Sequence, residues 1–296
     1  MKIAVSSYSY NQYISKGEMT QLDALRKAAE QGFDAIEFTE LRPENRKDAT
    51  KEERLEYARL LRGEAEKLGI EIAAYLVGAS LYNRSRAADK AEVKKLYDHL
   101  DVASALGVKL LRHDVCTKEI FDGKVVSFGK MLPTLAANTR KVTKYAKKLG
   151  IRTCTENHGF VAQDSDRVEQ LYNAVNHENY GILVDMGNFA CADEDSVRAV
   201  SRLAPYAIHA HAKDFIFKSA TEKKPEGFFD TLGGNHIRGT VIGHGIVPVG
   251  ACVSLLEKAG YEGWISIEFE GLEENINALA LGLEFLRSEV CRAMIF

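Results

Sequence analysis

Residues that can bind a metal ion or transfer a proton recur where short apolar runs end in the second half of the chain. Four of these runs have β-type sequence, and each ends in one of four groups: Glu156, Asp185, His211 and Glu268. Three carboxylates and one imidazole form an oxygen-rich set that suits Mn, Mg or Co at least as well as Zn. We therefore expect these side chains to hold one divalent metal ion, with Mn, Mg or Co preferred over Zn.

Two of the three carboxylates are also suited to proton transfer. When substrate oxygens fill the remaining coordination positions, a metal acidifies the adjacent substrate C–H by stabilising an enediolate. Further polar residues lie one to three positions after the expected ligands, and His113 stands at the end of the fourth apolar run of the chain. We expect substrate contacts, or support of the ligands, from these residues: His113, His158, Asn188, Lys213 and Asp214.

Two more residues share the side-chain direction of an expected ligand, because side chains two apart along a strand point to the same face. His209 precedes His211 by two positions, and we prefer His211 as the ligand because it lies nearer the strand end. Glu270 follows Glu268 by two positions but lies beyond the strand, so we expect it to remain outside the ligand set.

Strand patterns alternate with amphipathic helix patterns along the whole chain. Thr50 and Glu53 form a capping-box pattern for a helix that continues to Leu68, and Gly69 ends it. The predicted strands cover residues 2–6, 34–38, 71–77, 109–112, 151–155, 181–184, 207–210 and 264–267. The predicted helices cover residues 20–31, 50–68, 89–106, 133–149, 165–175, 196–203, 249–259 and 276–290. This alternation predicts parallel strands covered by helices.

Eight strand–helix units of roughly 37 residues each predict an α/β fold, a single-domain (β/α)8 TIM barrel over residues 1–296. The competing fold is a two-domain Rossmann arrangement, but no G-x-G-x-x-G segment follows the first strand. The strand C-termini of a barrel share one rim, so the four expected ligands converge there. Two long connections, 113–132 and 215–248, leave the same rim, and we interpret them as lids or substrate-binding loops. In the second connection, His236 and Arg238 either contact a substrate phosphate or carboxylate or belong to an ordinary surface loop.

Composition and charge argue against several classes of protein. The net charge of -3 lacks the basic excess typical of nucleic-acid binding. No apolar run approaches the roughly 20 residues that span a bilayer, and the N-terminus lacks the pattern of a signal peptide. The five cysteines are scattered without a CxxC pair, which is typical of reduced thiols. We therefore expect a cytoplasmic protein that binds neither nucleic acid nor a membrane.

At its motifs the chain resembles the sugar phosphate isomerase/epimerase group of the xylose isomerase-like TIM barrels. The matching segments are Glu156-Asn157-His158-Gly159, Asp185-Met186-Gly187-Asn188, His211-Ala212-Lys213-Asp214, and Gly243-His244-Gly245 leading into 259–268. The resemblance implies that the first residues of the first three segments and Glu268 bind one divalent cation. It also implies that the two glutamates form the acid/base pair of the family's ketose epimerases. By analogy with related barrels, it implies a homodimer or homotetramer.

Three positions depart from the pattern of the free-ketose 3-epimerases in this group. Phe217 stands where those enzymes usually have an arginine, and Asn188 stands where they have a histidine. His244 replaces an acidic residue in the Gly-x-Gly segment. These departures disfavour a simple ketohexose epimerase.

Four functions are therefore weighed. The leading one is a metal-dependent isomerase or epimerase of a small sugar, keto-sugar or related polyol, within carbohydrate metabolism. The alternative is a lyase that dehydrates a keto-inositol or keto-sugar, with His158 or Lys213 protonating the leaving group. An endonuclease-like trinuclear zinc site is disfavoured, because the first three strands lack the extra ligands it needs. A non-catalytic sugar-binding barrel is disfavoured, because all four expected ligands are present.

Overall fold

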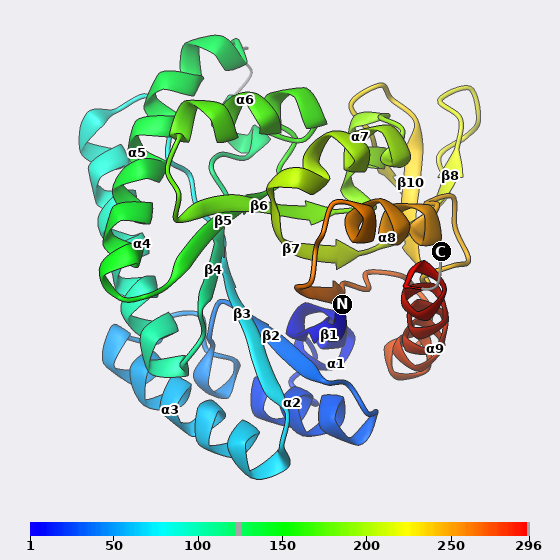
Figure 1. Cartoon of the computed structure of the whole chain (residues 1–296), viewed down its shortest axis with the longest axis horizontal. Helices are drawn as coiled ribbons and strands as arrows, with labels where there is room; N and C mark the ends of the chain where they lie inside the picture. Colours follow the sequence, from blue (N-terminus) through cyan, green and yellow to red (C-terminus); the bar gives the residue numbers. More distant parts are fainter. Residues whose placement is uncertain (122–125, 295–296) are drawn as a thin grey trace.

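The computed structural model of the chain describes residues 1–121 and 126–294. The strands that form its central sheet are β1 Lys2–Ser6, β2 Ala35–Thr39, β3 Glu71–Val77, β4 Leu110–His113, β5 Arg152–Glu156, β6 Tyr180–Asp185, β7 Ala207–Ala212 and β11 Trp264–Ile267. Within this described part, these eight parallel strands close a barrel in the order β1-β11-β7-β6-β5-β4-β3-β2 (Figure 1). The predicted TIM barrel is confirmed. Part of the expected loop 113–132, residues 122–125, lies outside the described residues.

Helices surround the barrel as an outer layer and cover the outer face of its strands (Figure 1). The main helices are α2 Gln21–Glu30, α3 Lys51–Leu68, α4 Arg86–Leu106, α5 Phe128–Lys148, α6 Ser165–Val175, α7 Ser196–Leu203, α8 Val249–Lys258 and α9 Asn275–Ala293. Shorter helices in the connections are η1 Ser7–Tyr10, α1 Asn11–Ile14, η2 Pro43–Asn45, η3 Lys118–Phe121, η4 Asn188–Ala192 and η5 Ala204–Tyr206.

Local sequence explains where α3 begins and ends. The Thr50 side chain accepts a hydrogen bond from the Glu53 backbone N–H, and the Glu53 side chain accepts one from the Thr50 N–H, as the capping-box pattern predicts. Gly69 ends the helix with a φ of 68°, a left-handed conformation that glycine adopts without strain.

The start of α5 differs from the prediction. We expected this helix to begin beside Pro133, but it begins at Phe128 and contains the proline in its second turn. Phe128 and Met131 are buried, so their apolar contacts extend the helix toward its N-terminus. Helix packing therefore outweighs the local signal of the proline.

The long connection after β7 is more ordered than the sequence indicated. It forms an antiparallel sheet of β8 Asp214–Lys218, β10 His236–Thr240 and β9 Phe229–Asp230, in the order β8-β10-β9. This sheet lies at the periphery beside α7 and α8 (Figure 1). The buried Asp214 carboxylate anchors the returning chain by accepting hydrogen bonds from the backbone N–H groups of Gly243, Gly245 and Val247. Asp214 therefore holds this connection in place, and it does not line the central cavity.

Strand alternation sorts the barrel residues into an inner and an outer set. A small apolar cluster of inward-facing residues includes Leu110, Cys154 and Leu183. Since side chains two apart share a face, Arg112 and Glu156 also point into the barrel, one step nearer the rim. The barrel interior thus has an apolar layer, followed by a polar layer at the C-terminal ends of the strands.

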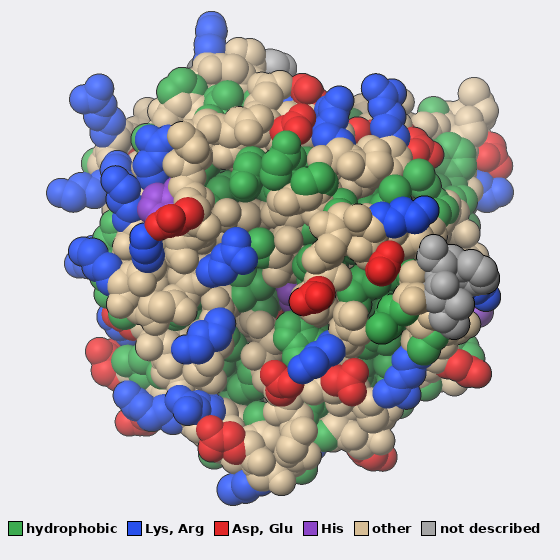
Figure 2. Space-filling model, viewed as in Figure 1, with side chains coloured by type: hydrophobic (Ala, Val, Ile, Leu, Met, Phe, Trp, Pro, Cys, Tyr) green, Lys and Arg blue, Asp and Glu red, His purple; other side chains and the backbone are tan. Residues whose placement is uncertain are grey.

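The surface is mixed in charge. The face shown in Figure 2 carries basic and acidic side chains interspersed, with hydrophobic atoms exposed between them. Among residues 1–121 and 126–294, no helix combines the length and the apolar character required to cross a bilayer.

Candidate metal centre and active site

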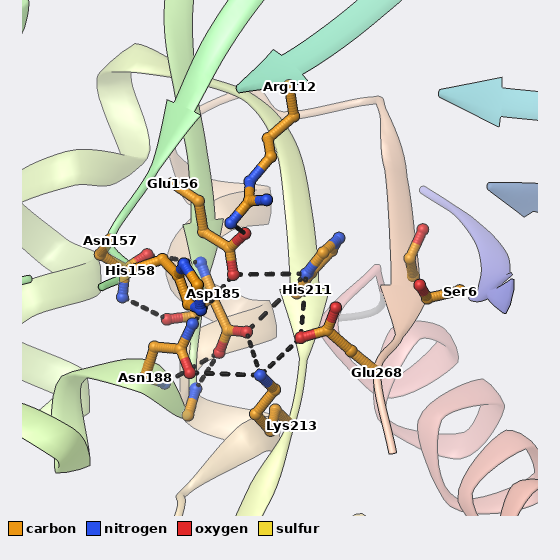
Figure 3. Close-up of polar contacts among 12 residues, drawn as sticks. Ser6, Arg112, Glu156, Asn157, His158, Asp185, Asn188, His211, Lys213 and Glu268 are labelled. Carbon is orange, nitrogen blue, oxygen red and sulfur yellow. Dashed lines mark hydrogen bonds and ion pairs between the residues drawn. The ribbon is translucent and has the colours of Figure 1, made fainter. Parts of the chain in front are cut away.

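The barrel brings the four expected metal ligands together at one rim. Glu156 ends β5, Asp185 ends β6, His211 lies in β7 and Glu268 follows β11. The Nδ1 atom of His211 lies 3.6 Å from Glu156 Oε1, 3.7 Å from Asp185 Oδ2 and 3.8 Å from Glu268 Oε2 (Figure 3). One potential ligand atom from each residue lies within 4.8 Å of the others. The four groups therefore face one common point.

Two buried atoms at this point lack a hydrogen-bond partner among the described residues: Asp185 Oδ2 and His211 Nδ1. The other oxygen of Asp185 is fixed by the backbone N–H groups of Gly187 (2.7 Å) and Asn188 (2.9 Å). A buried polar atom without a partner is costly. A divalent ion would satisfy both atoms and reduce the repulsion among the three neighbouring carboxylates. The site is thus consistent with a divalent metal.

His211 is oriented from behind by Glu37, a residue of β2 that we did not predict at the site. Glu37 Oε1 lies 2.8 Å from His211 Nε2. The other oxygen, Oε2, lies 2.6 Å from His209 Nε2 and accepts a 2.8 Å hydrogen bond from Ser266 Oγ. Burial would raise the pKa of Glu37, but the two imidazoles outweigh burial and hold it far below its usual range. A carboxylate beside Nε2 favours the proton of His211 on that nitrogen, which leaves Nδ1 available to a metal.

One sequence signal pointed to Glu37: it is a carboxylate inside the apolar run of residues 35–38. The predicted strand ends at Phe38, so Glu37 does not stand at a strand end, which is where the four ligands are predicted. The structure also settles the direction of His209, which turns toward Glu37 and not toward the common point of the four ligands.

A chain of charged side chains runs from Glu156 through Arg112 and Asp114 to His158. The Arg112 guanidinium lies 2.6 Å from Glu156 Oε2 and 2.8 Å from Asp114 Oδ1. Asp114 Oδ1 in turn lies 2.9 Å from His158 Nδ1. Burial would raise the pKa of Glu156 and of Asp114, but Arg112 outweighs it and both pKa values are lowered. Burial would lower the pKa of His158, but Asp114 outweighs it and raises that pKa.

Lys213 approaches the same site from the opposite side. Its ammonium lies 2.5 Å from Glu268 Oε2 and 3.5 Å from Asp185 Oδ2, and it donates a 3.2 Å hydrogen bond to Asn188 Oδ1. Asn188 then donates from Nδ2 to Glu156 Oε1 at 2.9 Å. Burial would lower the pKa of Lys213, but Glu268 and its neighbours outweigh it and raise the pKa well above the usual value. Lys213 and Asn188 therefore belong to the hydrogen-bonded frame of the site (Figure 3).

Three residues expected to contact the substrate lie elsewhere. His113 is fully buried, and its Nδ1 bonds to the Asp114 carbonyl, because strand alternation directs Arg112 inward and His113 outward. His236 pairs with Asp230, and Arg238 pairs with Glu273, in the sheet of the connection after β7. Among the described residues, none of the three lines the central cavity.

The central cavity has a volume of about 450 Å³, which is in the range of small-molecule sites. Glu156, His158, Lys213, Glu268 and Glu270 line it on the metal-site side. On the other side its described lining comes from the segments after β1 and β2 and from the end of β3, and includes Tyr8, Asn11, Gln21, Arg42 and Asn45. We expected the connections 113–132 and 215–248 to supply the substrate contacts. Opposite the metal site, the lining that the structure describes instead comes from the segments after β1 and β2, where the sequence slightly favours packing over a pocket role for Tyr8.

The fold and this rim define the chain as a TIM barrel with a buried His/Glu/Asp site consistent with a divalent metal. The family model described as "Xylose isomerase-like TIM barrel" matches residues 25–289, and the chain belongs to this family.

Two curated relatives and one solved structure show the range of similar proteins. The inosose dehydratase of Clostridium perfringens strain 13 is 26% identical over 186 residues, and the match spans 60% of this chain but only 63% of that protein. The inosose dehydratase of Mesomycoplasma hyopneumoniae strain J is 25% identical over 285 residues, which cover 92% of this chain and 89% of that protein. A D-psicose 3-epimerase crystallised with D-fructose superposes with a TM-score of 0.72 at 16% identity, covering 98% of this chain and 99% of that one. The last similarity is one of fold alone.

Proposed function

We propose that this chain is a divalent-metal-dependent lyase that removes water from a polyhydroxylated ketone such as a keto-inositol. Glu156, Asp185, His211 and Glu268 would hold the ion. When bound, a divalent ion polarises the substrate carbonyl and stabilises the charge that develops on its oxygen. The two curated relatives reported above, both named inosose dehydratases, support this substrate class at 25–26% identity.

The observation that carries the proposal is the position of His158. Its side chain is 44% exposed, it lines the cavity, and Asp114 orients it through a 2.9 Å contact. The two glutamates, in contrast, are each paired with a buried cation: Glu156 with Arg112 and Glu268 with Lys213. Loss of a hydroxyl as water is helped by a positioned proton donor, and His158 is an accessible donor of this kind.

The solvent exposure of the two glutamates indicates which of them acts as the general base. The Glu268 side chain is 13% exposed, whereas that of Glu156 is 2% exposed, so Glu268 is the better placed general base. Glu268 takes the proton from the carbon next to the carbonyl, and the electron pair of that C–H bond forms the new carbon–carbon double bond. The C–O bond at the next carbon breaks, and His158 donates the proton with which the hydroxyl leaves as water. Lys213 holds Glu268 in position beside the substrate.

A second candidate is the isomerase or epimerase that the sequence motifs favoured. The supporting observation is that Glu156 Oε1 and Glu268 Oε2 lie at similar distances from His211 Nδ1, 3.6 Å and 3.8 Å. Two carboxylates on one substrate site can remove and return a proton without loss of a leaving group. Product mass separates the two candidates, because an isomerisation leaves it unchanged.

The test incubates the Mn-loaded protein with scyllo-inosose in deuterated water, followed by NMR and mass spectrometry. The lyase predicts a product lighter by one water. His158→Asn is expected to keep deuterium exchange at the acidic carbon but to slow dehydration about 100-fold or more. His244→Asn, at an exposed histidine outside the cavity lining, is the matched control. A deuterated isomer of unchanged connectivity and no water loss would support the epimerase instead.

A further inference from the structure

A positively charged side chain without a carboxylate partner lines the cavity on the side of the early strands. Arg42 follows β2, and no carboxylate of residues 1–121 and 126–294 lies within 4.0 Å of its guanidinium. The other lining cations are engaged: Arg112 by Asp114 and Glu156, and Lys213 by Glu268. Among the described residues, Arg42 is therefore the lining arginine or lysine that has no carboxylate to pair with.

The position of Arg42 relative to the metal site follows from the strand order. In the closed barrel, β2 lies diametrically opposite β6, the strand that ends in Asp185. The cavity extends from Arg42 to the metal site, because its lining includes both Arg42 and Glu156, which ends β5 next to β6. The cavity of about 450 Å³ has room for a small polyol between Arg42 and the metal site.

The segment that carries Arg42 is held rigidly. The buried Gln21 accepts a 2.9 Å hydrogen bond from the Arg42 backbone N–H. The same side chain donates to the carbonyls of Thr39 and Glu40, at 3.3 Å and 3.2 Å. Asn45 donates from Nδ2 to the Met19 carbonyl at 2.9 Å and adopts a φ of 61°. A fixed backbone reduces the entropy lost when the arginine side chain binds a ligand.

Two groups near Arg42 indicate which ligand groups this side of the cavity can bind. Glu40 also lines the cavity, but Arg54 pairs with it at 3.3 Å and offsets its charge. Asn45 Oδ1 is buried and has no hydrogen-bond partner in the described part of the chain. An acceptor without a donor fits a hydroxyl group, and a free guanidinium fits a carboxylate or a phosphate.

We propose that Arg42 binds an anionic group of the substrate, so that the natural substrate is a keto-polyol carrying a carboxylate or a phosphate. The statement that the substrate is a ketone rests on the proposed function. The binding of an anion by Arg42 beside Asn45 is independent of the proposed function. The guanidinium would form paired, charge-assisted hydrogen bonds with the anion, and Asn45 Oδ1 would accept from a neighbouring hydroxyl.

The experiment measures binding to the Mn-loaded protein by calorimetry with three six-carbon probes of similar size. These are scyllo-inosose, which is neutral, 5-keto-D-gluconate, which carries a carboxylate, and fructose 6-phosphate. Arg42→Gln is expected to weaken the better-bound anionic probe about 10- to 100-fold and to change the neutral probe less than about threefold. Arg42→Lys should retain part of the affinity. Arg46→Gln is the matched control, because Arg46 belongs to the same segment but pairs with Glu53 and does not line the cavity.

The outcomes separate the two proposals. Tighter binding of an anionic probe that is lost in Arg42→Gln supports the inference, whether or not any probe loses water. The preferred probe then decides between carboxylate and phosphate. Equal binding of all three probes, or equal losses in Arg42→Gln and Arg46→Gln, overturns the inference. Dehydration of the neutral probe would leave the proposed function standing in that case.

Discussion

Glu37 Oε1 lies 2.8 Å from His211 Nε2, on the side of the imidazole opposite the three rim carboxylates. Glu37 comes from β2 and His211 from β7, so the contact crosses the interior of the barrel. A carboxylate behind a metal-binding histidine fixes both its ring orientation and its protonated nitrogen. Glu37 thus orients the His211 ring, although its strand, β2, carries none of the four expected ligands.

We predict that Glu37→Gln weakens Mn binding about 10- to 100-fold, because the neutral amide no longer fixes the proton on His211 Nε2. Titration calorimetry measures the affinity, and the ¹⁵N shifts of the His211 ring report the protonated nitrogen. Glu71→Gln is the control, since Glu71 pairs with Lys2 at the surface. Unchanged affinity and unchanged ring shifts in Glu37→Gln would contradict the assigned role.

Removal of divalent ions is expected to destabilise the protein. The site gathers three carboxylates, and an ion that binds only the folded state stabilises it by about 2.7 kcal/mol at a concentration 100 times its Kd. Thermal unfolding after treatment with a chelator, and again after addition of MnCl2, measures the effect. Asp185→Asn should abolish the increase in Tm on adding Mn. An equal increase with NaCl of the same ionic strength would show that screening, not binding, is responsible.

Arg112→Gln is predicted to destabilise the metal-free protein by about 3 kcal/mol or more, because Glu156 and Asp114 would remain buried without their cation. Urea unfolding of the variant and the wild type measures the difference. Arg46→Gln, which removes a solvent-exposed pair with Glu53, is expected to cost less than about 1 kcal/mol. Similar losses for the two variants would mean that the buried chain of charges contributes little.

His113 is predicted to govern acid stability and not substrate binding. Burial, the largest cause, lowers its pKa to about 4 from an ordinary value of 6.5. The neutral ring is therefore favoured in the folded state, and the stability it contributes is present above pH 6.5 and lost as the pH falls toward 4. We expect unfolding free energies to fall between pH 7 and pH 5 by about 2 kcal/mol from this residue alone.

The comparison for this prediction is His113→Asn, whose side chain can keep the hydrogen bond to the Asp114 carbonyl. Its stability should depend on pH less steeply than that of the wild type over this range. His244→Asn changes an exposed ring and serves as the control. Parallel curves for His113→Asn and the wild type would refute the assignment.

The barrel and its rim could be predicted because they depend on local patterns. Short apolar runs, capping signals such as Thr50 with Glu53, and closing glycines such as Gly69 recur along the chain. The geometry of a parallel barrel then brings Glu156, Asp185, His211 and Glu268 to one place. The helix start at Phe128 could not be predicted, because tertiary packing of Phe128 and Met131 determines it.

The residues that support the site from the barrel interior are harder to predict from the sequence. Glu37 lies one residue before the predicted end of its strand, and Arg112 resembles an ordinary charged residue until the face of its strand is known. His113 was expected at the site because it ends β4, but the phase of the strand directs it outward. Arg42 lies in a short connection without a motif, so only the shape of the cavity indicates its position.

The most direct test of the metal site is anomalous diffraction from crystals of the protein soaked in MnCl2. We expect one strong Mn peak at the rim, bound by carboxylate oxygens of Glu156, Asp185 and Glu268 and by Nδ1 of His211. Glu37 should remain in contact with Nε2. A peak located elsewhere, or an ion bound through Nε2 with Glu37 displaced, would show that these four residues do not form the metal site described here.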